Sequence, residues 1–349
     1  MNINRAVKTI DKSNYIRFLV EFPDQLRDAL AIEIPGTAKQ KTDIHNIVVA
    51  GMGGSAIGGE LVQSIYYDEI PVPLQIVRDY NLPSFVNRSS LVIVSSYSGN
   101  TEETLSAYGQ ALQTGAAVIC ITTGGMLAQN AERDGIPVVF LPKGYQPRAA
   151  VGFSAIPLLR ILNGYGLLSE KISGIDETIN CLRNLNRKYS PENGEQSGPF
   201  KLARRIKGKI PVIYTGSPPF YVLGTRWRCQ LNENAQILAY SNTIPELNHN
   251  EIMGWDKEAS NVGVVFVIFL RDKEESTAIA RRMDITQEII RKHSGEFAEV
   301  RSTGKSVFAK VFSLLYYGDY TSYYLALINQ KDPSDIENIN YLKSKLQKL

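Results

Sequence analysis

The chain has 349 residues, more than one hydrophobic core usually supports, so two α/β units of about 150 residues each are expected. Its apolar fraction of 44% and charged fraction of 21% are those of an ordinary globular protein and exclude general disorder. The formal charge of +3 is small and the Lys and Arg residues are scattered, which argues against nucleic acid or an anionic membrane as the main partner.

No apolar run reaches the length of a membrane span, because the best one, residues 262–270, has only the length of a strand. The first five residues lack the apolar segment and small-residue cleavage site of a secretory signal. We therefore expect a cytoplasmic protein with no membrane partner.

The chain contains three cysteines and three histidines, and neither set has the spacing of metal ligands. The odd number of cysteines also argues against a disulfide framework. Cys120 lies in an apolar run and is expected to be a buried core residue. The sequence therefore predicts chemistry that needs no metal and no cofactor.

Short β-branched runs alternate with helical stretches, which is the pattern of a parallel sheet with helices on both faces. In the first half five strands are predicted to form one doubly wound sheet: residues 47–50, 74–77, 91–95, 117–122 and 138–141. A polar stretch, residues 184–198, then indicates a linker.

The same pattern restarts in the second half. Strands are predicted at residues 212–215, 264–269 and 298–301, and helices at 221–237, 275–293, 307–328 and 334–346. The fold class is therefore α/β with two doubly wound units: residues 1–185, a linker at 186–200, and residues 201–349. In such sheets ligands bind outside the carboxyl ends of the strands.

Glycines crowd the turn after the first predicted strand, residues 51–59, with the sequence GMGGSAIGG. Glycine permits close backbone approach, and the helix that follows directs free N–H groups at an anion. The turn favours a phosphate or similar anion. A dinucleotide site and plain packing are the alternatives, although the acidic residue that a dinucleotide site needs is represented only by Asp79.

Three hydroxyl side chains lie within six residues at the end of the third predicted strand: Ser96, Ser98 and Thr101. Each can donate to a phosphate oxygen while backbone amides complete the site. The competing interpretation is a helix N-cap, but one cap needs one hydroxyl. The pattern therefore favours a phosphate site.

These two motifs, residues 53–55 (GGS) and 96–101 (SYSGNT), resemble the sugar isomerase (SIS) domain, a fold that binds phosphosugars. With residues 147–150 (PRAA) and 245–251 (PELNHNE), the chain is similar to the bifunctional phosphoglucose/phosphomannose isomerases. The first two motifs are those of SIS domains in general, whereas the last two are specific to the isomerases. The resemblance covers residues 45 to 345.

The resemblance implies a set of phosphate contacts, Gly54, Ser55, Ser96, Ser98 and Thr101. It also implies that Arg148 neutralises an enediolate. A fixed positive charge beside a developing oxyanion is a large catalytic term, which suits this role.

Three further residues take catalytic roles by resemblance. Glu233 matches the base that moves a proton between C2 and C1. His249, in a polar loop, matches the histidine that assists ring opening. Lys343, in an I-x-x-L-K pattern of the last helix, matches the catalytic lysine. The turn before that helix departs from the family, because residues 332–334 read D-P-S where D-P-T is usual, so that Ser334 replaces the threonine.

The resemblance implies an isomerase that interconverts glucose 6-phosphate or mannose 6-phosphate with fructose 6-phosphate through a cis-enediolate, a reaction of glycolysis and gluconeogenesis. It also implies a homodimer in which His249 is contributed across the interface. The alternative is a non-catalytic phosphosugar-binding regulator, although no DNA-binding segment is visible. An amidotransferase would need an early nucleophilic cysteine, which the sequence lacks.

Overall fold

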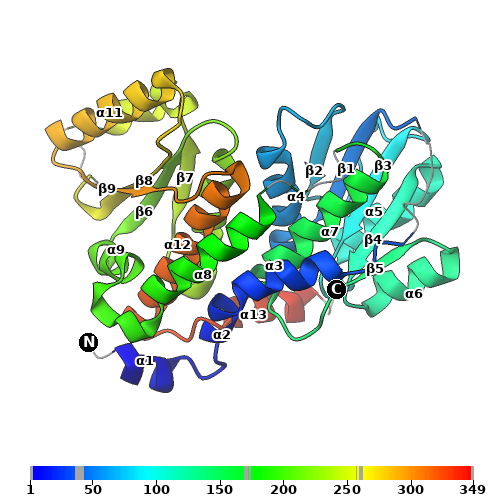
Figure 1. Ribbon diagram of the computed structural model, residues 1–349, viewed down its shortest axis with the longest axis horizontal. Helices are drawn as coiled ribbons and strands as arrows, with labels where there is room; N and C mark the ends of the chain where they lie inside the picture. Colours follow the sequence, from blue (N-terminus) through cyan, green and yellow to red (C-terminus); the bar gives the residue numbers. More distant parts are fainter. Residues whose placement is uncertain are drawn as a thin grey trace. The chain divides into compact units, whose positions relative to one another are not determined.

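Two parallel sheets organise the chain, and each belongs to its own compact unit (Figure 1). The computed structural model describes residues 3–35, 43–168, 172, 174–256, 258 and 262–346. The described residues between Glu21 and Ile179 form the first unit, and those up to Val20 together with those from Asn180 onward form the second unit. The predicted α/β class, with helices flanking two parallel sheets, is confirmed.

The first unit contains a sheet with strand order β2-β1-β3-β4-β5, in which all neighbouring strands are parallel. Its strands are β1 (Asn46–Gly51), β2 (Leu74–Val77), β3 (Ser90–Ser95), β4 (Ala117–Thr122) and β5 (Val138–Phe140). Its helices are α3 (Phe22–Ala31), α4 (Gly53–Ile65), α5 (Glu102–Thr114), α6 (Gly125–Asp134), η1 (Pro147–Ala149) and α7 (Val151–Gly164). The five predicted strands are confirmed to within one residue at each end.

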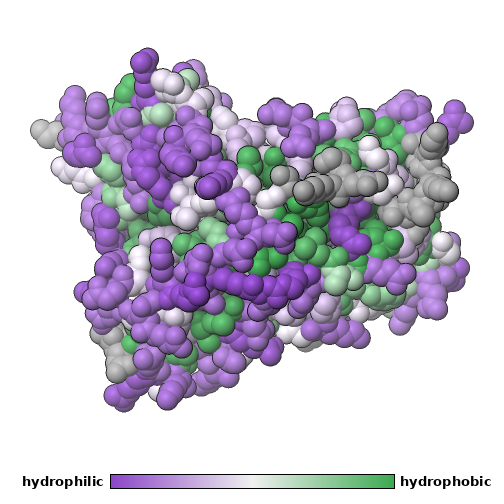
Figure 2. Space-filling model, viewed as in Figure 1, coloured by the Kyte–Doolittle hydropathy of each residue, from purple (hydrophilic) through white to green (hydrophobic). Residues whose placement is uncertain are grey.

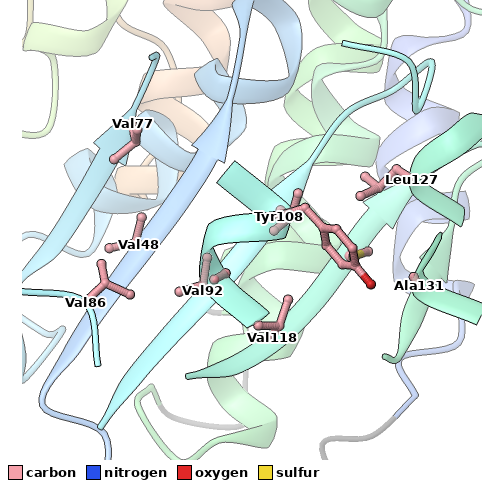
Figure 3. Packing of buried hydrophobic residues seen from close by; sticks show 11 residues of the cluster. Val48, Val77, Val86, Val92, Tyr108, Val118, Leu127 and Ala131 are labelled. Atoms are coloured by element: carbon pink, nitrogen blue, oxygen red, sulfur yellow. The ribbon is translucent and has the colours of Figure 1, made fainter. Parts of the chain in front are cut away.

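Successive residues of a strand point to opposite sides of the sheet. Because these strands are apolar on both sides, helices cover both faces of the sheet. On one face, Val48, Val92 and Val118 of neighbouring strands pack against Tyr108 of α5 and Leu127 of α6 (Figure 3). On the other face lies α4, which α7 contacts along its length. This packing fixes the start of α4 beside the carboxyl ends of β1 and β3.

The second unit contains a parallel sheet with strand order β7-β6-β8-β9. Its strands are β6 (Ile210–Thr215), β7 (Tyr240–Thr243), β8 (Val265–Arg271) and β9 (Glu296–Arg301). Its helices are α1 (Ile3–Ile10), α2 (Ile16–Val20), η2 (Pro191–Gln196), α9 (Gly198–Ile206), α10 (Tyr221–Asn234), η3 (Glu246–His249), η4 (Glu251–Gly254), η5 (Val262–Val264), α11 (Thr277–Lys292), α12 (Val307–Ile328) and α13 (Glu337–Leu346). The helix α8 (Ile175–Tyr189) begins in the first unit and ends in the second.

Several boundaries differ from the sequence prediction for identifiable reasons. The strand β7 was not predicted, because its four residues (YSNT) are partly exposed and have no apolar pattern. The helix α10 ends at Asn234, since Gln236 takes a positive φ of 53°. The helix α13 begins only at Glu337, whose N–H donates to the Asp335 carboxylate (3.0 Å). The polar residues 184–198 are mostly helical, in α8, η2 and the start of α9.

Tyrosines of the buried helix α12 bind the first residues of the chain to the second unit. The Tyr316 hydroxyl donates to the Leu19 carbonyl (2.7 Å), and the Tyr323 hydroxyl donates to the Asp11 carboxylate (3.1 Å). Asp11 also accepts from the backbone N–H of Tyr15 (2.6 Å). A buried hydroxyl needs such a partner, so these bonds fix α1 and α2 against α12.

The exposed side of α11 is mostly hydrophilic, as the space-filling view shows in the region of this helix (Figure 2). Its buried residues include Met283 and Ile290, which belong to the core beneath the helix. Within the described ranges no helix is long and apolar enough to cross a membrane.

The contact between α10 and α12 yields a prediction about stability. A Cβ added at Gly318 would lie 2.4 Å from Cε2 of the fully buried Trp227. Gly318→Ala should therefore lower the free energy of unfolding by about 1–3 kcal/mol, the usual cost of overpacking. Denaturant unfolding followed by circular dichroism measures this. Gly109→Ala in α5 is the control, because its Cβ meets nothing within 4 Å. Equal stability of wild type and Gly318→Ala would contradict the prediction.

Candidate active site

The turn between β1 and α4 lies against the segment that carries Arg148. A Cβ at Gly54 would be 2.4 Å from the Pro147 carbonyl oxygen and 2.8 Å from the Arg148 backbone nitrogen. No other residue type fits this approach, because real Cβ contacts are longer. The first turn of α4 therefore packs directly against η1 at Gly54. A site formed by the glycine turn and the Arg148 segment requires this contact.

Ser55 connects this turn with the loop after β3, which we call the hydroxyl loop (residues 96–101). Its Oγ accepts a hydrogen bond from the backbone N–H of Tyr97 (3.0 Å). Ser55 is 8% exposed, so its hydroxyl has a defined position at the edge of the sheet. The two predicted phosphate-binding motifs are thus in direct contact.

The three hydroxyls of the hydroxyl loop have different surroundings. Ser96 is buried, donates to Thr101 Oγ1 (3.1 Å) and accepts from the Gly99 N–H (3.1 Å). Ser98 is exposed and accepts from the Asn100 N–H (3.3 Å). Thr101 is the N-cap residue of α5, but its side chain makes no capping hydrogen bond. The cap therefore does not account for these hydroxyls, which leaves an anion site as the better interpretation.

The hydroxyl loop owes its shape to Gly99, which has a φ of +71° that side chains rarely allow. A Cβ there would lie 1.8 Å from the Gly124 carbonyl oxygen in the turn after β4. The Leu127 N–H donates to the Gly99 carbonyl (2.9 Å) from α6. Contacts with the turn after β4 and with α6 therefore determine the backbone path of the loop at Gly99.

Arg148 is 4% exposed, in agreement with a close-packed and oriented guanidinium. Its segment is held by Gln25 of α3, whose amide nitrogen donates to the Ala149 carbonyl (2.9 Å). The amide oxygen of Gln25 accepts from the Gly152 N–H (2.8 Å). Gln25 was missed in the sequence, because its partners lie more than 120 positions away and no local pattern marks it.

Glu233 lies near the end of α10, which is tightly bound to α12. The Arg226 guanidinium forms two bonds with the Asp319 carboxylate (2.7 and 3.1 Å), and both residues are buried. One residue after Glu233, the Asn234 amide donates to Ser322 Oγ (3.0 Å). Because a buried ion pair and a buried amide fix the helix, the position of the Glu233 backbone is well defined.

A pocket of about 430 Å³ opens beside Glu233. It is lined by the end of α10 and the start of α13: Asn232, Glu233, Gln236, Ile237, Leu238, Asp335, Ile336, Glu337, Asn338 and Ile339. The Gln236 amide donates to Asp335 (3.4 Å), which links its two walls. Of these residues, only Glu233 has a role that the family resemblance implies.

His249 lies on η3 and is exposed. The loop itself is ordered, since Leu247 is fully buried and the Asn248 amide donates to Thr286 Oγ1 of α11 (2.9 Å). His249 is not among the described residues that line the Glu233 pocket. The structure therefore places this histidine on an outward-facing, rigid loop of the second unit.

Lys343 lies on α13, where all described residues are exposed or partly exposed. It follows Ile339 by four positions, so the two share one helix face. Ile339 lines the Glu233 pocket, and Lys343 lies about 6 Å further along the helix axis at 1.5 Å per residue. In the turn before α13, Ser334 Oγ is buried and has no hydrogen-bond partner among the described residues.

The second sheet has charged side chains where the first sheet has the hydroxyl loop. Asp272 follows β8 directly, as Ser96 follows β3, and it is 3% exposed. It accepts from Ser302 Oγ, from the Glu274 N–H (2.8 Å) and from Lys310 Nζ (3.2 Å). Burial raises the pKa of Asp272, but these bonds outweigh burial and lower it overall. A phosphate would meet a buried carboxylate here, so this edge is not a second phosphate site.

Among the described residues no group of three or more His, Cys, Asp or Glu side chains could hold a metal ion. Cys120 is buried as predicted, and burial raises the pKa of its thiol to about 12. It is therefore an inert core residue rather than a nucleophile.

The predicted site residues fall into two groups, one in each unit. In the first unit the structure brings together the predicted phosphate contacts and Arg148, because Gly54 contacts η1 and Ser55 contacts the hydroxyl loop. In the second unit Glu233 lines a pocket that also contains the start of the helix of Lys343.

Comparison with known proteins gives relatives of nearly full length. The bacterial phospho-glucose isomerase C-terminal SIS domain matches residues 195–346. A bifunctional phosphoglucose/phosphomannose isomerase from Caldicellulosiruptor bescii is 42% identical over 94% of this chain and 97% of its own length. A D-glucosamine-6-phosphate 4-epimerase from Sulfolobus acidocaldarius is 32% identical over 72% of this chain and 76% of its own length.

Solved structures share the fold. A hypothetical protein from Thermus thermophilus matches with a TM-score of 0.76 and 15% identity, over 99% of this chain and 93% of that one. A glucose-6-phosphate isomerase like protein from the same organism matches with a TM-score of 0.65 and 18% identity, over 99% of each chain. At these identities the likeness concerns the fold alone.

The hydroxyl loop yields a binding prediction. Ser96→Ala removes a buried hydroxyl that donates to Thr101 Oγ1 in this structure and can rotate its proton to a phosphate oxygen instead. Loss of a hydrogen bond to a charged group should weaken the binding of inorganic phosphate by about 10- to 100-fold, measured by calorimetric titration. Ser106→Ala is the matched control, because that hydroxyl bonds Gln110 within α5 (3.1 Å). Unchanged phosphate affinity in Ser96→Ala would move the site elsewhere.

Proposed function

The chain belongs to the family of bifunctional phosphoglucose/phosphomannose isomerases, as its motifs predict, and we propose that it interconverts glucose 6-phosphate and mannose 6-phosphate with fructose 6-phosphate. The observation that carries this proposal is the contact between the glycine turn, the hydroxyl loop and the segment of the buried Arg148. The hydroxyls can bind a phosphate group, and the Arg148 guanidinium supplies a fixed positive charge. This combination suits a sugar phosphate whose reacting carbonyl end develops negative charge during the reaction.

The phosphate group is held by Ser55, Ser96, Ser98 and Thr101, with the amides at the start of α4 beside Gly54. The hydroxyls donate to the phosphate oxygens, and the helix N-terminus adds favourable partial charge. The buried Asp272 at the corresponding edge of the second sheet supports a single phosphate site per chain.

Glu233 acts as the base. In the open-chain aldose it removes the proton from C2, and the electron pair moves to give a cis-enediolate whose O1 carries the negative charge. A proton then passes from the O2 hydroxyl to O1, which moves the negative charge to O2, and Arg148 stabilises the charge on either oxygen. Glu233 returns its proton to C1 while O2 becomes the carbonyl oxygen of the ketose. Glucose 6-phosphate and mannose 6-phosphate differ only in the configuration at C2, and the enediolate has no stereocentre at C2. One site therefore serves both aldoses.

His249 and Lys343 open the sugar ring by moving a proton between the ring oxygen and O1. We propose that the enzyme is a homodimer in which His249 completes the site of the partner. The exposed position of His249 on an ordered polar loop supports this arrangement.

We propose that the enzyme acts in the cytoplasm, on the route shared by glycolysis and gluconeogenesis. All three cysteines are free, as in proteins of reducing compartments. Its substrates are charged phosphosugars, which do not cross a lipid bilayer unaided.

The assignment of the base yields a kinetic prediction. Glu233→Gln keeps the size and hydrogen bonding of the side chain but removes its basicity. Formation of fructose 6-phosphate should slow by about 10²–10⁴-fold from both glucose 6-phosphate and mannose 6-phosphate, with KM little changed. A coupled assay measures both rates, and Glu288→Gln on the exposed side of α11 is the control.

Other outcomes distinguish the alternatives. Near-wild-type turnover of Glu233→Gln would exclude this base. Conversion by the wild type into an aldose with inverted C4, seen by NMR, would indicate an epimerase like the relative from Sulfolobus. Binding of sugar phosphate without any turnover would favour a regulator.

The proposed dimer yields a complementation prediction. Chains with Glu233→Gln and chains with His249→Ala are each inactive, but hybrid dimers contain one doubly defective site and one intact site. Activity should reappear after the two variants are dissociated and reassembled together. If hybrid dimers form and remain inactive, both residues act within one chain.

A further inference from the structure

Tyr97 lies between Ser96 and Ser98 in the hydroxyl loop, yet its phenol has partners outside that loop. Its hydroxyl donates to the Pro142 carbonyl (2.8 Å) and accepts from the backbone N–H of Tyr145 (3.0 Å). One side chain therefore bridges two points of the segment that leads from β5 to Arg148. We call this stretch, residues 142–150, the arginine segment.

The backbone of Tyr97 is bound to two further turns. Its N–H donates to Ser55 Oγ (3.0 Å) at the start of α4. Its carbonyl accepts from the Thr123 N–H (3.0 Å) after β4. The turns after β1, β3, β4 and β5 thus all meet at this residue, and its backbone cannot shift without moving the Ser55 hydroxyl.

The arginine segment has four sets of restraints around Arg148. Gly54 contacts it from α4, and Gln25 binds its far end at Ala149. At its near end Tyr145 packs edge to face on Phe153 of α7, with ring centroids 5.2 Å apart. The Tyr97 hydroxyl is the restraint that comes from the hydroxyl loop itself.

We propose that Tyr97 is a positioning residue that couples phosphate binding to the placement of Arg148, a proposal that rests on the proposed isomerase function. A phosphate on Ser96 and Ser98 fixes the loop between them. The Tyr97 phenol then holds the arginine segment so that the guanidinium faces the developing enediolate. Binding energy from the non-reacting phosphate is thereby used to orient a catalytic group.

The phenol can serve as this link because it stays neutral. Burial raises the pKa of Tyr97, and the hydrogen bond from the Tyr145 N–H lowers it by less, so the pKa lies above its ordinary value. At neutral pH the hydroxyl therefore has a proton for the Pro142 carbonyl and a lone pair for Tyr145.

Tyr97→Phe tests the link, because it removes the hydroxyl and leaves the ring and the backbone bonds in place. We expect kcat to fall about tenfold while KM and the affinity for inorganic phosphate change less than twofold. Tyr108→Phe is the matched control, since it removes a hydroxyl that donates to Asp134 (2.8 Å) on α6, and its kinetics should equal those of the wild type.

A double-mutant cycle shows whether Tyr97 acts through Arg148. In an Arg148→Lys background, Tyr97→Phe should reduce kcat less than twofold further, because the group that it positions is already altered. A tenfold loss in both backgrounds would overturn the proposal. So would a Tyr97→Phe variant with unchanged kcat and weakened phosphate binding, which would make Tyr97 part of the phosphate site.

Hydrogen exchange separates this proposal from the proposed reaction. In the full-length wild type, inorganic phosphate should protect the backbone amides of both the hydroxyl loop and the arginine segment. In Tyr97→Phe, protection of the hydroxyl loop should remain and that of the arginine segment should disappear. Equal protection of the arginine segment in both proteins would overturn the coupling, whatever reaction the enzyme catalyses. Absence of isomerase turnover in the wild type would instead refute the proposed function.

Discussion

At Gly54 the first turn of α4 comes so close to the backbone of Pro147 and Arg148 that a single Cβ would separate them. The proposed phosphate site at the carboxyl edge of the first sheet depends on this contact. The contact brings the start of α4, with the Ser55 hydroxyl, next to the backbone of the buried Arg148, although their motifs are about 90 residues apart in the chain. Tyr97 and Gln25 then hold the two ends of the arginine segment in that position.

The two sheets show how one topology is used for different purposes. Both have a central pair of parallel strands followed by turns and helices, β1 and β3 in one unit, β6 and β8 in the other. In the first unit these turns carry glycines and hydroxyls. In the second, Asp272 and Lys310 form an ion pair in the corresponding place, and the proposed base, Glu233, lies at the opposite end of α10. The chemical character of each unit is therefore set by the residues in its turns and at its helix ends, and not by the fold that the two units share.

The predictable features are those that depend on neighbouring residues. Strands of the first sheet were predicted closely because they are continuous β-branched runs buried on both faces. The hydroxyl loop was found because Ser96, Ser98 and Thr101 lie within six residues. The bonds of Gln25 and Tyr97 were not predictable, since each joins residues more than 40 positions apart. The roles of Glu233 and Lys343 came from resemblance, because a glutamate or lysine on a helix has no local mark of function.

The hydrogen bonds between α12 and the first residues of the chain determine the order in which the two units can fold during translation. Leu19 and Asp11 precede their tyrosine partners by 297 and 312 positions, which corresponds to roughly 15–60 s of translation at typical rates. The first unit is contiguous, from Glu21 to Ile179, so it can fold while the ribosome is still translating. The second unit must wait until its last long helix has emerged. During that interval the apolar faces of α1 and α2 are unburied, and this is the period in which the nascent chain most needs protection from aggregation.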